Sequence, residues 1–113
     1  MNLYLVSQDE ITGYDTYSEM VVAAVDEIAA RQTHPPTIFN PTWNAERKCW
    51  WHTRPKRLSE YADVRFNMPD ENISECYQSR VWANKEENIK VTYLGVADVS
   101  VKPGIIVASF HAG

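Results

Sequence analysis

The chain has 113 residues, which is enough for one domain with a single core. Hydrophobic residues make up 44% and charged residues 23%, a balance that excludes a disordered chain, and the net charge of −4 argues against general nucleic-acid binding. No run approaches the roughly 18 apolar residues of a membrane span, and the first ten residues lack the pattern of a secretory signal. We therefore expect a cytoplasmic protein whose thiols stay reduced.

The N-terminal third is predicted to form a β-hairpin followed by a helix. Leu3–Gln8 and Tyr17–Val25 are apolar, strand-like runs joined by a polar loop that contains Gly13. Asp26 is a candidate helix cap, and good helix formers follow it as far as His34, where two prolines end the helix. His34 is then expected beside the terminal helix carbonyls.

The middle of the chain, from about residue 37 to 80, has irregular signals and three prolines. Within it, RLSEYADVRFN predicts one helical turn and then a strand-like run, and DENISECYQSR begins with a candidate cap and predicts a short helix. A structureless loop of this length is unusual in a compact domain. We therefore expect a long, partly structured insertion that packs over or beside the sheet.

The C-terminal third is predicted to supply two more strands. Asn88–Val99 alternates between apolar and polar residues, which is typical of a half-buried strand. Ile105–Phe110 is an almost continuous apolar run after a Pro-Gly turn, and it predicts a central strand buried on both faces. The predicted fold class is a single α+β domain over residues 1–113. Its core is a small, mainly antiparallel four-stranded sheet with one short covering helix.

Charge is unevenly distributed along the chain. No Lys or Arg precedes Arg31, whereas five of the eleven cations lie between Arg47 and Arg57. Acidic residues near the hairpin tip predict a secondary acidic surface, made of Asp9, Glu10, Asp15 and Glu19. Paired carboxylates act as acid and base only in a cleft that separates their pKa values, and the sequence indicates no such cleft. We predict no catalytic residue and a non-enzymatic protein.

The segment KCWWHTRPKR, residues 48–57, contains a candidate metal ligand pair. Cys49 and His52 have the spacing of zinc ligands, and Cys76, His34 or His111 could complete a tetrahedral site. A second close ligand pair, which would make the signal strong, is missing. We therefore predict no bound metal and no cofactor, with Cys49 packed as a small apolar residue.

The same segment combines cations with two neighbouring indoles. Phosphate-pairing charges beside stacking faces are typical of a single-strand nucleic-acid site, but Trp and Arg are also enriched at protein–protein hot spots. We expect one of Trp50 and Trp51 to anchor the insertion in the core, and the other to form a contact surface with Arg54 and Arg57. The candidate partner-binding residues are Arg47, Lys48, Trp50, Trp51, Arg54, Lys56 and Arg57.

Several short motifs carry a resemblance to a known group of proteins. They are YLVSQ, GYDTY, VVAA, Ala30-Arg31 before His34-Pro35, VTYLGVA and the terminal GIIVASFHAG. In these stretches, roughly residues 3–35 and 82–113, the chain resembles small uncharacterised proteins encoded by phages and prophages. It departs from them between about residues 37 and 80, where a shorter connection is expected.

The resemblance implies a phage accessory protein in a bacterial cytoplasm, and it carries over no activity. Together with the basic segment, it leads us to expect a non-enzymatic protein that binds and modulates a host protein, as an inhibitor of a bacterial defence system. The alternative is binding of nucleic acid or a nucleotide through residues 47–57. The sequence does not name the partner or the oligomeric state.

Overall fold

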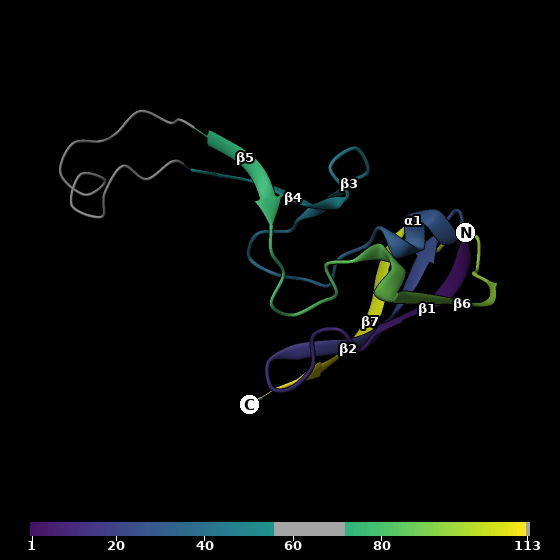
Figure 1. The fold of residues 1–113 in the computed structure, drawn as a ribbon. Helices are drawn as coiled ribbons and strands as arrows, with labels where there is room; N and C mark the ends of the chain where they lie inside the picture. Colours follow the sequence, from purple (N-terminus) through teal and green to yellow (C-terminus); the bar gives the residue numbers. More distant parts are fainter. Residues whose placement is uncertain (56–71, 113) are drawn as a thin grey trace.

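The computed structural model describes residues 1–55 and 72–112 (Figure 1). Its larger sheet has four antiparallel strands in the order β6-β1-β2-β7. The strands are β1 (Asn2–Gln8), β2 (Thr16–Ala24), β6 (Ile89–Val96) and β7 (Gly104–His111). All four predicted strands are therefore present, within two or three residues of their expected ends.

β1 and β2 form the predicted hairpin. Their register places Tyr4 opposite Val22 and Val6 opposite Met20, and these four side chains are buried on one face of the sheet. Because side chains alternate along a strand, the odd-numbered positions between them point to the other face.

Helix α1 (Glu27–Arg31) lies against the buried face of the larger sheet (Figure 1). Asp26 caps it as predicted, with its Oδ1 accepting the Ala29 N–H at 2.8 Å. Ala30 is fully buried in the core. The helix ends at Arg31, three residues before the predicted end. No described helix is long and apolar enough to cross a membrane.

β7 is an edge strand in the described structure, so the prediction of a central strand buried on both faces is wrong. Its only described strand partner is β2, and Val107 keeps 59% of its surface exposed. The pairing of β2 with β7 is also interrupted by two register shifts. An apolar run predicts a β-strand, but it does not show whether that strand has one neighbouring strand or two.

A second, three-stranded antiparallel sheet occupies the segment that was predicted to be a long, partly structured insertion. Its order is β3-β4-β5, from β3 (Thr42–Asn44), β4 (Cys49–Pro55) and β5 (Asn72–Tyr77). The short helix predicted over residues 70–80 is therefore wrong, because Asn72–Tyr77 forms strand β5. The helical turn and the strand predicted in residues 57–67 lie outside the described residues.

The two sheets share one hydrophobic core, although the chain passes between them only after α1 and after β5 (Figure 1). Trp50 of β4 joins Trp82 and Ala83 in the same buried cluster as the inward residues of β1 and β2. A short 3-10 turn, η1 (Glu86–Asn88), leads from this cluster into β6. The architecture is mainly antiparallel β with one short α-helix, which agrees in part with the predicted α+β class.

Candidate functional site

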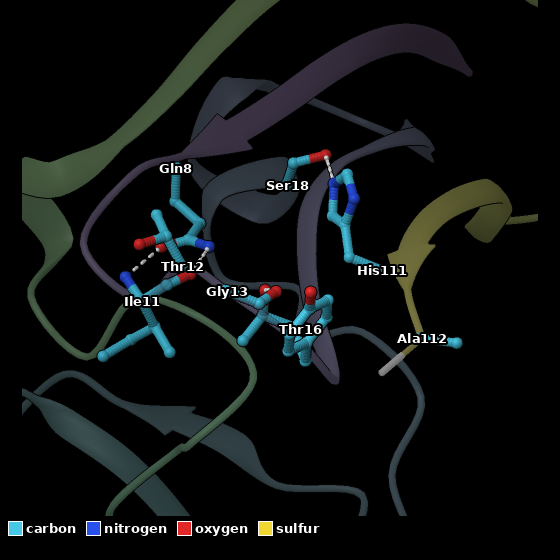
Figure 2. Close-up of a pocket in the computed structure, with 9 residues that line it drawn as sticks. Gln8, Ile11, Thr12, Gly13, Thr16, Ser18, His111 and Ala112 are labelled. Atoms are coloured by element: carbon cyan, nitrogen blue, oxygen red, sulfur yellow. Dashed lines mark hydrogen bonds between the residues drawn. The ribbon is translucent and has the colours of Figure 1, made fainter.

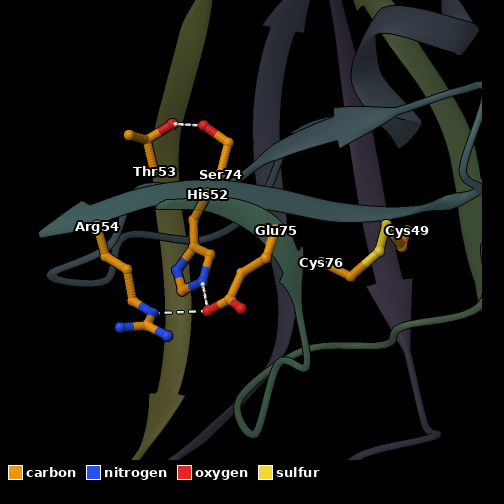
Figure 3. A network of polar contacts seen from close by, with 7 residues as sticks. All are labelled: Cys49, His52, Thr53, Arg54, Ser74, Glu75 and Cys76. Atoms are coloured by element: carbon orange, nitrogen blue, oxygen red, sulfur yellow. Dashed lines mark hydrogen bonds and ion pairs between the residues drawn. A yellow bond between two sulfur atoms is a disulfide. The ribbon is translucent and has the colours of Figure 1, made fainter. Parts of the chain in front are cut away.

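The alternation of β4 divides the predicted basic and aromatic segment between two faces of the small sheet. Trp50 is opposite Tyr77, and His52 is opposite Glu75, so these residues share one face with Arg54. Cys49, Trp51 and Thr53 point to the other. Figure 3 shows the division, because His52, Arg54 and Glu75 lie on one side of the ribbon and Thr53 and Ser74 lie on the other.

Trp50 is the anchor that the sequence predicted one of the two tryptophans to be. It is 1% exposed, and its Nε1–H donates to the Ala83 carbonyl at 2.8 Å. Its ring makes edge contacts with Trp43, at 5.1 Å between centroids, and with His34, at 4.9 Å. A partner molecule cannot reach this indole in the folded protein.

Trp51 is half-buried on the opposite face, where the Arg47 guanidinium lies 5.9 Å from the centre of its ring. This distance permits a cation–π interaction. In the register, Trp51 is opposite Cys76, and Cys76 forms a disulfide with Cys49, with 5.9 Å between their Cα atoms. We call Arg47, Cys49, Trp51, Thr53, Ser74 and Cys76 the Trp51 face.

The disulfide corrects the expectation that both cysteines are reduced. The chain has two cysteines and so allows one pairing, and the expectation of reduced thiols came from the predicted cytoplasmic location. Disulfides persist mainly in oxidising environments, so the cytoplasmic location stays a prediction. Two cysteines joined to each other also cannot supply the thiolates of the zinc site considered for Cys49, His52 and Cys76.

On the other face, Glu75 binds two side chains of β4 (Figure 3). Its Oε1 accepts from Arg54 Nε at 2.6 Å and lies 3.3 Å from His52 Nε2. The Arg54 hydrogen bond, followed by that of His52, holds the pKa of the Glu75 carboxyl below its usual value. Arg54 is therefore engaged within the sheet, away from the Trp51 face.

Lys48, the remaining predicted cation among the described residues, lies elsewhere than Trp51. Lys48 adopts a left-handed backbone conformation (φ 53°) in the β3–β4 turn. It lines a separate hollow together with Trp43, Glu86 and Glu87. Lys56 and Arg57 lie outside the described residues. Of the seven predicted partner-binding residues, the described structure brings Arg47 and Trp51 together.

His34 makes a buried contact between the two segments that link the sheets, and its predicted place at the helix end is wrong. Its Nε2 lies 2.8 Å from Ser79 Oγ and its Nδ1 lies 2.7 Å from the Pro35 carbonyl oxygen. Ser79 Oγ already accepts the Trp82 N–H at 3.1 Å, so its own hydroxyl is free to donate to His34 Nε2. We therefore assign the imidazole proton to Nδ1, which donates to the Pro35 carbonyl. Burial lowers the pKa of His34 to about 4, although the hydrogen bond to Pro35 opposes this shift.

The predicted acidic residues lie in different surroundings. Glu10 has a structural role, because its carboxylate accepts the Asn84 N–H at 2.9 Å, the Lys85 N–H at 3.2 Å and the Asn88 amide at 2.9 Å. Partial burial would raise the pKa of Glu10, but these hydrogen bonds outweigh burial and lower it. Asp9 and Asp15 are exposed in the hairpin loop, and Glu19 is exposed on β2.

A shallow pocket of about 650 Å³ opens beside the hairpin loop and the end of β7 (Figure 2). Ser18 Oγ and His111 Nε2 lie 3.0 Å apart on its wall. The Gln8 side chain also lines the pocket, and it donates to the Ile11 and Tyr17 carbonyls at 2.7 and 2.6 Å. Sequence reasoning missed the Ser18–His111 contact, because no local signal links residues 93 positions apart.

Within the described ranges, no three His, Cys, Asp or Glu side chains are grouped so that they could hold a metal ion. Comparison with protein-family models, with curated proteins and with solved structures found no match to this chain. The candidate site therefore rests on its geometry: a half-buried indole and a stacked guanidinium on a cross-linked sheet face.

Proposed function

We propose that this chain is a non-enzymatic accessory protein of the phage type that binds a bacterial host protein through the Trp51 face. We extend the proposal to the host partner, which we take to be a component of a bacterial defence system that the protein inhibits. The observation that carries the proposal is the placement of Trp51, whose ring lies on the opposite face of β4 from the anchor Trp50 and under Arg47.

Three properties of this face support protein binding. Trp and Arg are the side chains most enriched among residues that dominate binding energy. The Cys49–Cys76 disulfide fixes β4 to β5 directly beside Trp51, which reduces the conformational entropy lost on binding. The Arg47 charge favours an acidic partner surface and would increase the association rate with it.

The test is capture of partners from bacterial lysates with a tagged copy of the chain, followed by mass spectrometry. We expect one protein at near-stoichiometric yield. Trp51→Ala should weaken its binding by about 30-fold, as for a hot-spot residue, and Arg47→Ala by a few-fold, as for a solvent-exposed cation–π contact. Binding constants for the purified pair give both numbers.

Tyr14→Ala is the matched control, because Tyr14 is an aromatic side chain that is 81% exposed in the hairpin loop, outside the Trp51 face. This variant should retain the partner fully. The proposal fails if no protein is retained from several lysates, or if Trp51→Ala binds as tightly as the original chain.

The alternative, binding of nucleic acid or a nucleotide through residues 47–57, uses the same Arg47–Trp51 pair as a stacking surface. Treating the lysate with nuclease and raising the salt concentration distinguish this alternative from protein binding. Retention that depends on nucleic acid and falls steeply with salt would support this alternative. Retention of a protein after nuclease treatment supports the proposal.

A further inference from the structure

The larger sheet has an apolar row on the face opposite its core. Since Tyr4, Val6, Met20 and Val22 point inward, Leu5 and Val21 point outward. The register places Leu5 opposite Val21 and Val21 opposite Val107, so three apolar side chains cross three neighbouring strands. A groove of about 350 Å³ opens along them. An antiparallel sheet that faces water usually has polar residues in these positions.

A polar row with two opposite charges runs beside this apolar row. Ser7 is paired with Lys90 on one side and with Glu19 on the other, and Glu19 is paired with Ser109. Lys90 and Glu19 are both exposed, and β1 lies between their strands. Two strand spacings, about 10 Å, separate their backbones, so the two charges are poorly placed to pair within one sheet.

We propose that this outer face binds the same face of a second copy of the chain, about a two-fold axis that runs parallel to the strands between the two sheets. Rotation about this axis reverses the order of the strands but keeps each row level. The Leu5–Val21 row then meets its own copy. Lys90 of each copy lies opposite Ser109 of the other, one strand away from Glu19, so the opposite charges approach each other twice. The two Glu19 side chains, also one strand apart, approach each other once, so attraction exceeds repulsion by two contacts to one.

The charges also select this axis over the alternative. With a two-fold axis perpendicular to the strands, overlap of the apolar rows would place Glu19 and Lys90 against the row that contains Leu3 and Ala23. That arrangement would remove water from two charges without pairing them, which is unfavourable. Charge complementarity and apolar overlap occur together when the strands run parallel to the axis.

The expected dimer is weak. Four strands about 4.8 Å apart and the six paired positions of β1 and β2 give a footprint of about 400 Å² per copy. Stable interfaces bury about 800 Å² per partner. We therefore expect a dissociation constant of roughly ten to a few hundred micromolar.

Analytical ultracentrifugation of the full chain over a wide concentration range tests the proposal. The original chain should change from monomer to dimer as its concentration rises. Glu19→Lys and Lys90→Glu should each weaken the dimer about tenfold, because each reversal acts twice. The double variant Glu19→Lys/Lys90→Glu should restore association. Glu87→Lys, at an exposed position in η1, is the matched control and should associate like the original chain.

Two outcomes would overturn the proposal. A chain that stays monomeric at every concentration has no such self-contact, and the open face would then belong to a different partner. A dimer that tolerates both single reversals, or that the double variant does not restore, forms through another surface or about another axis. Circular dichroism of each variant establishes that the substituted chains are folded. Binding through the Trp51 face is measured separately and can fail or succeed without affecting this result.

Discussion

Acidification should destabilise this protein through one buried imidazole, that of His34, at pH values where carboxylates are still ionised. Folding holds His34 between Ser79 and the Pro35 carbonyl and lowers its pKa from 6.5 to about 4. Between these two pH values the unfolded chain binds a proton that the folded chain does not. Because protons then favour the unfolded state, stability is complete above about pH 6.5 and falls as the pH falls towards 4.

The size of the effect follows from the shift in pKa. One pH unit corresponds to 1.36 kcal/mol, so the full window represents a loss of about 3 kcal/mol, of which about three quarters is lost by pH 4.5. The carboxyls of Glu10 and Glu75 have lowered pKa values, so their contribution is lost only below about pH 4.5. The range from pH 6.5 to 4.5 therefore isolates His34 from these carboxyls.

Urea denaturation at several pH values measures the loss. Between pH 7 and 4.5 the midpoint should fall by about 1 M. His34→Gln should be less stable at pH 7, because it disturbs the contact with Ser79, but its stability should change much less over the same range. His111→Gln, at an exposed position, should keep the original pH dependence. A midpoint that is constant from pH 6.5 to 4.5, or an NMR titration that places the pKa of His34 near 6.5, would refute the reasoning.

Two further predictions concern cross-links within the fold. Reduction of the Cys49–Cys76 disulfide, or the double change to Ser, should lower the free energy of unfolding by about 3.5 kcal/mol, the loop-closure value for 27 residues; denaturation with and without reductant checks this, and an unchanged midpoint would contradict it. Glu10→Gln should cost about 1 kcal/mol at neutral pH, because a neutral acceptor replaces a carboxylate that binds three groups at residues 84–88. Glu87→Gln is the control for that measurement, and equal losses in the two variants would show that the Glu10 contacts contribute nothing.

The larger sheet was accessible from the sequence because its signals are local. The hairpin has two apolar runs and a loop with Gly13, and the helix has a cap at Asp26 that the structure confirms. The edge position of β7 was not accessible, because the apolar residues of Ile105–Phe110 suit both an edge strand and a central strand. Strand order depends on pairings between distant segments, and the sequence of one strand does not identify its neighbours.

The small sheet was not predicted because none of its strands, taken alone, shows a clear strand pattern in the sequence. β5 alternates as Ile73, Glu75 and Tyr77 on one face, but the acidic residues before it suggested a helix cap. In β4, the two adjacent indoles and the cations obscured an alternation that sends Trp50 and Trp51 to opposite faces. The contact of His34 with Ser79 joins residues 45 positions apart, beyond any local pattern. The two cysteines allow a single pairing, but their sequence does not tell whether they are oxidised.

The burial of Trp50 has a consequence for how the chain can lose or gain structure. Its indole packs in the same hydrophobic core as the inward side chains of the larger sheet. Its hydrogen bond to the Ala83 carbonyl joins β4 to the segment before β6. A chain from which residues 42–77 were deleted would keep all four strands of the larger sheet but would have a cavity of indole size at its centre. The small sheet therefore cannot be exchanged like an ordinary surface loop, and we expect both sheets to melt in a single cooperative transition.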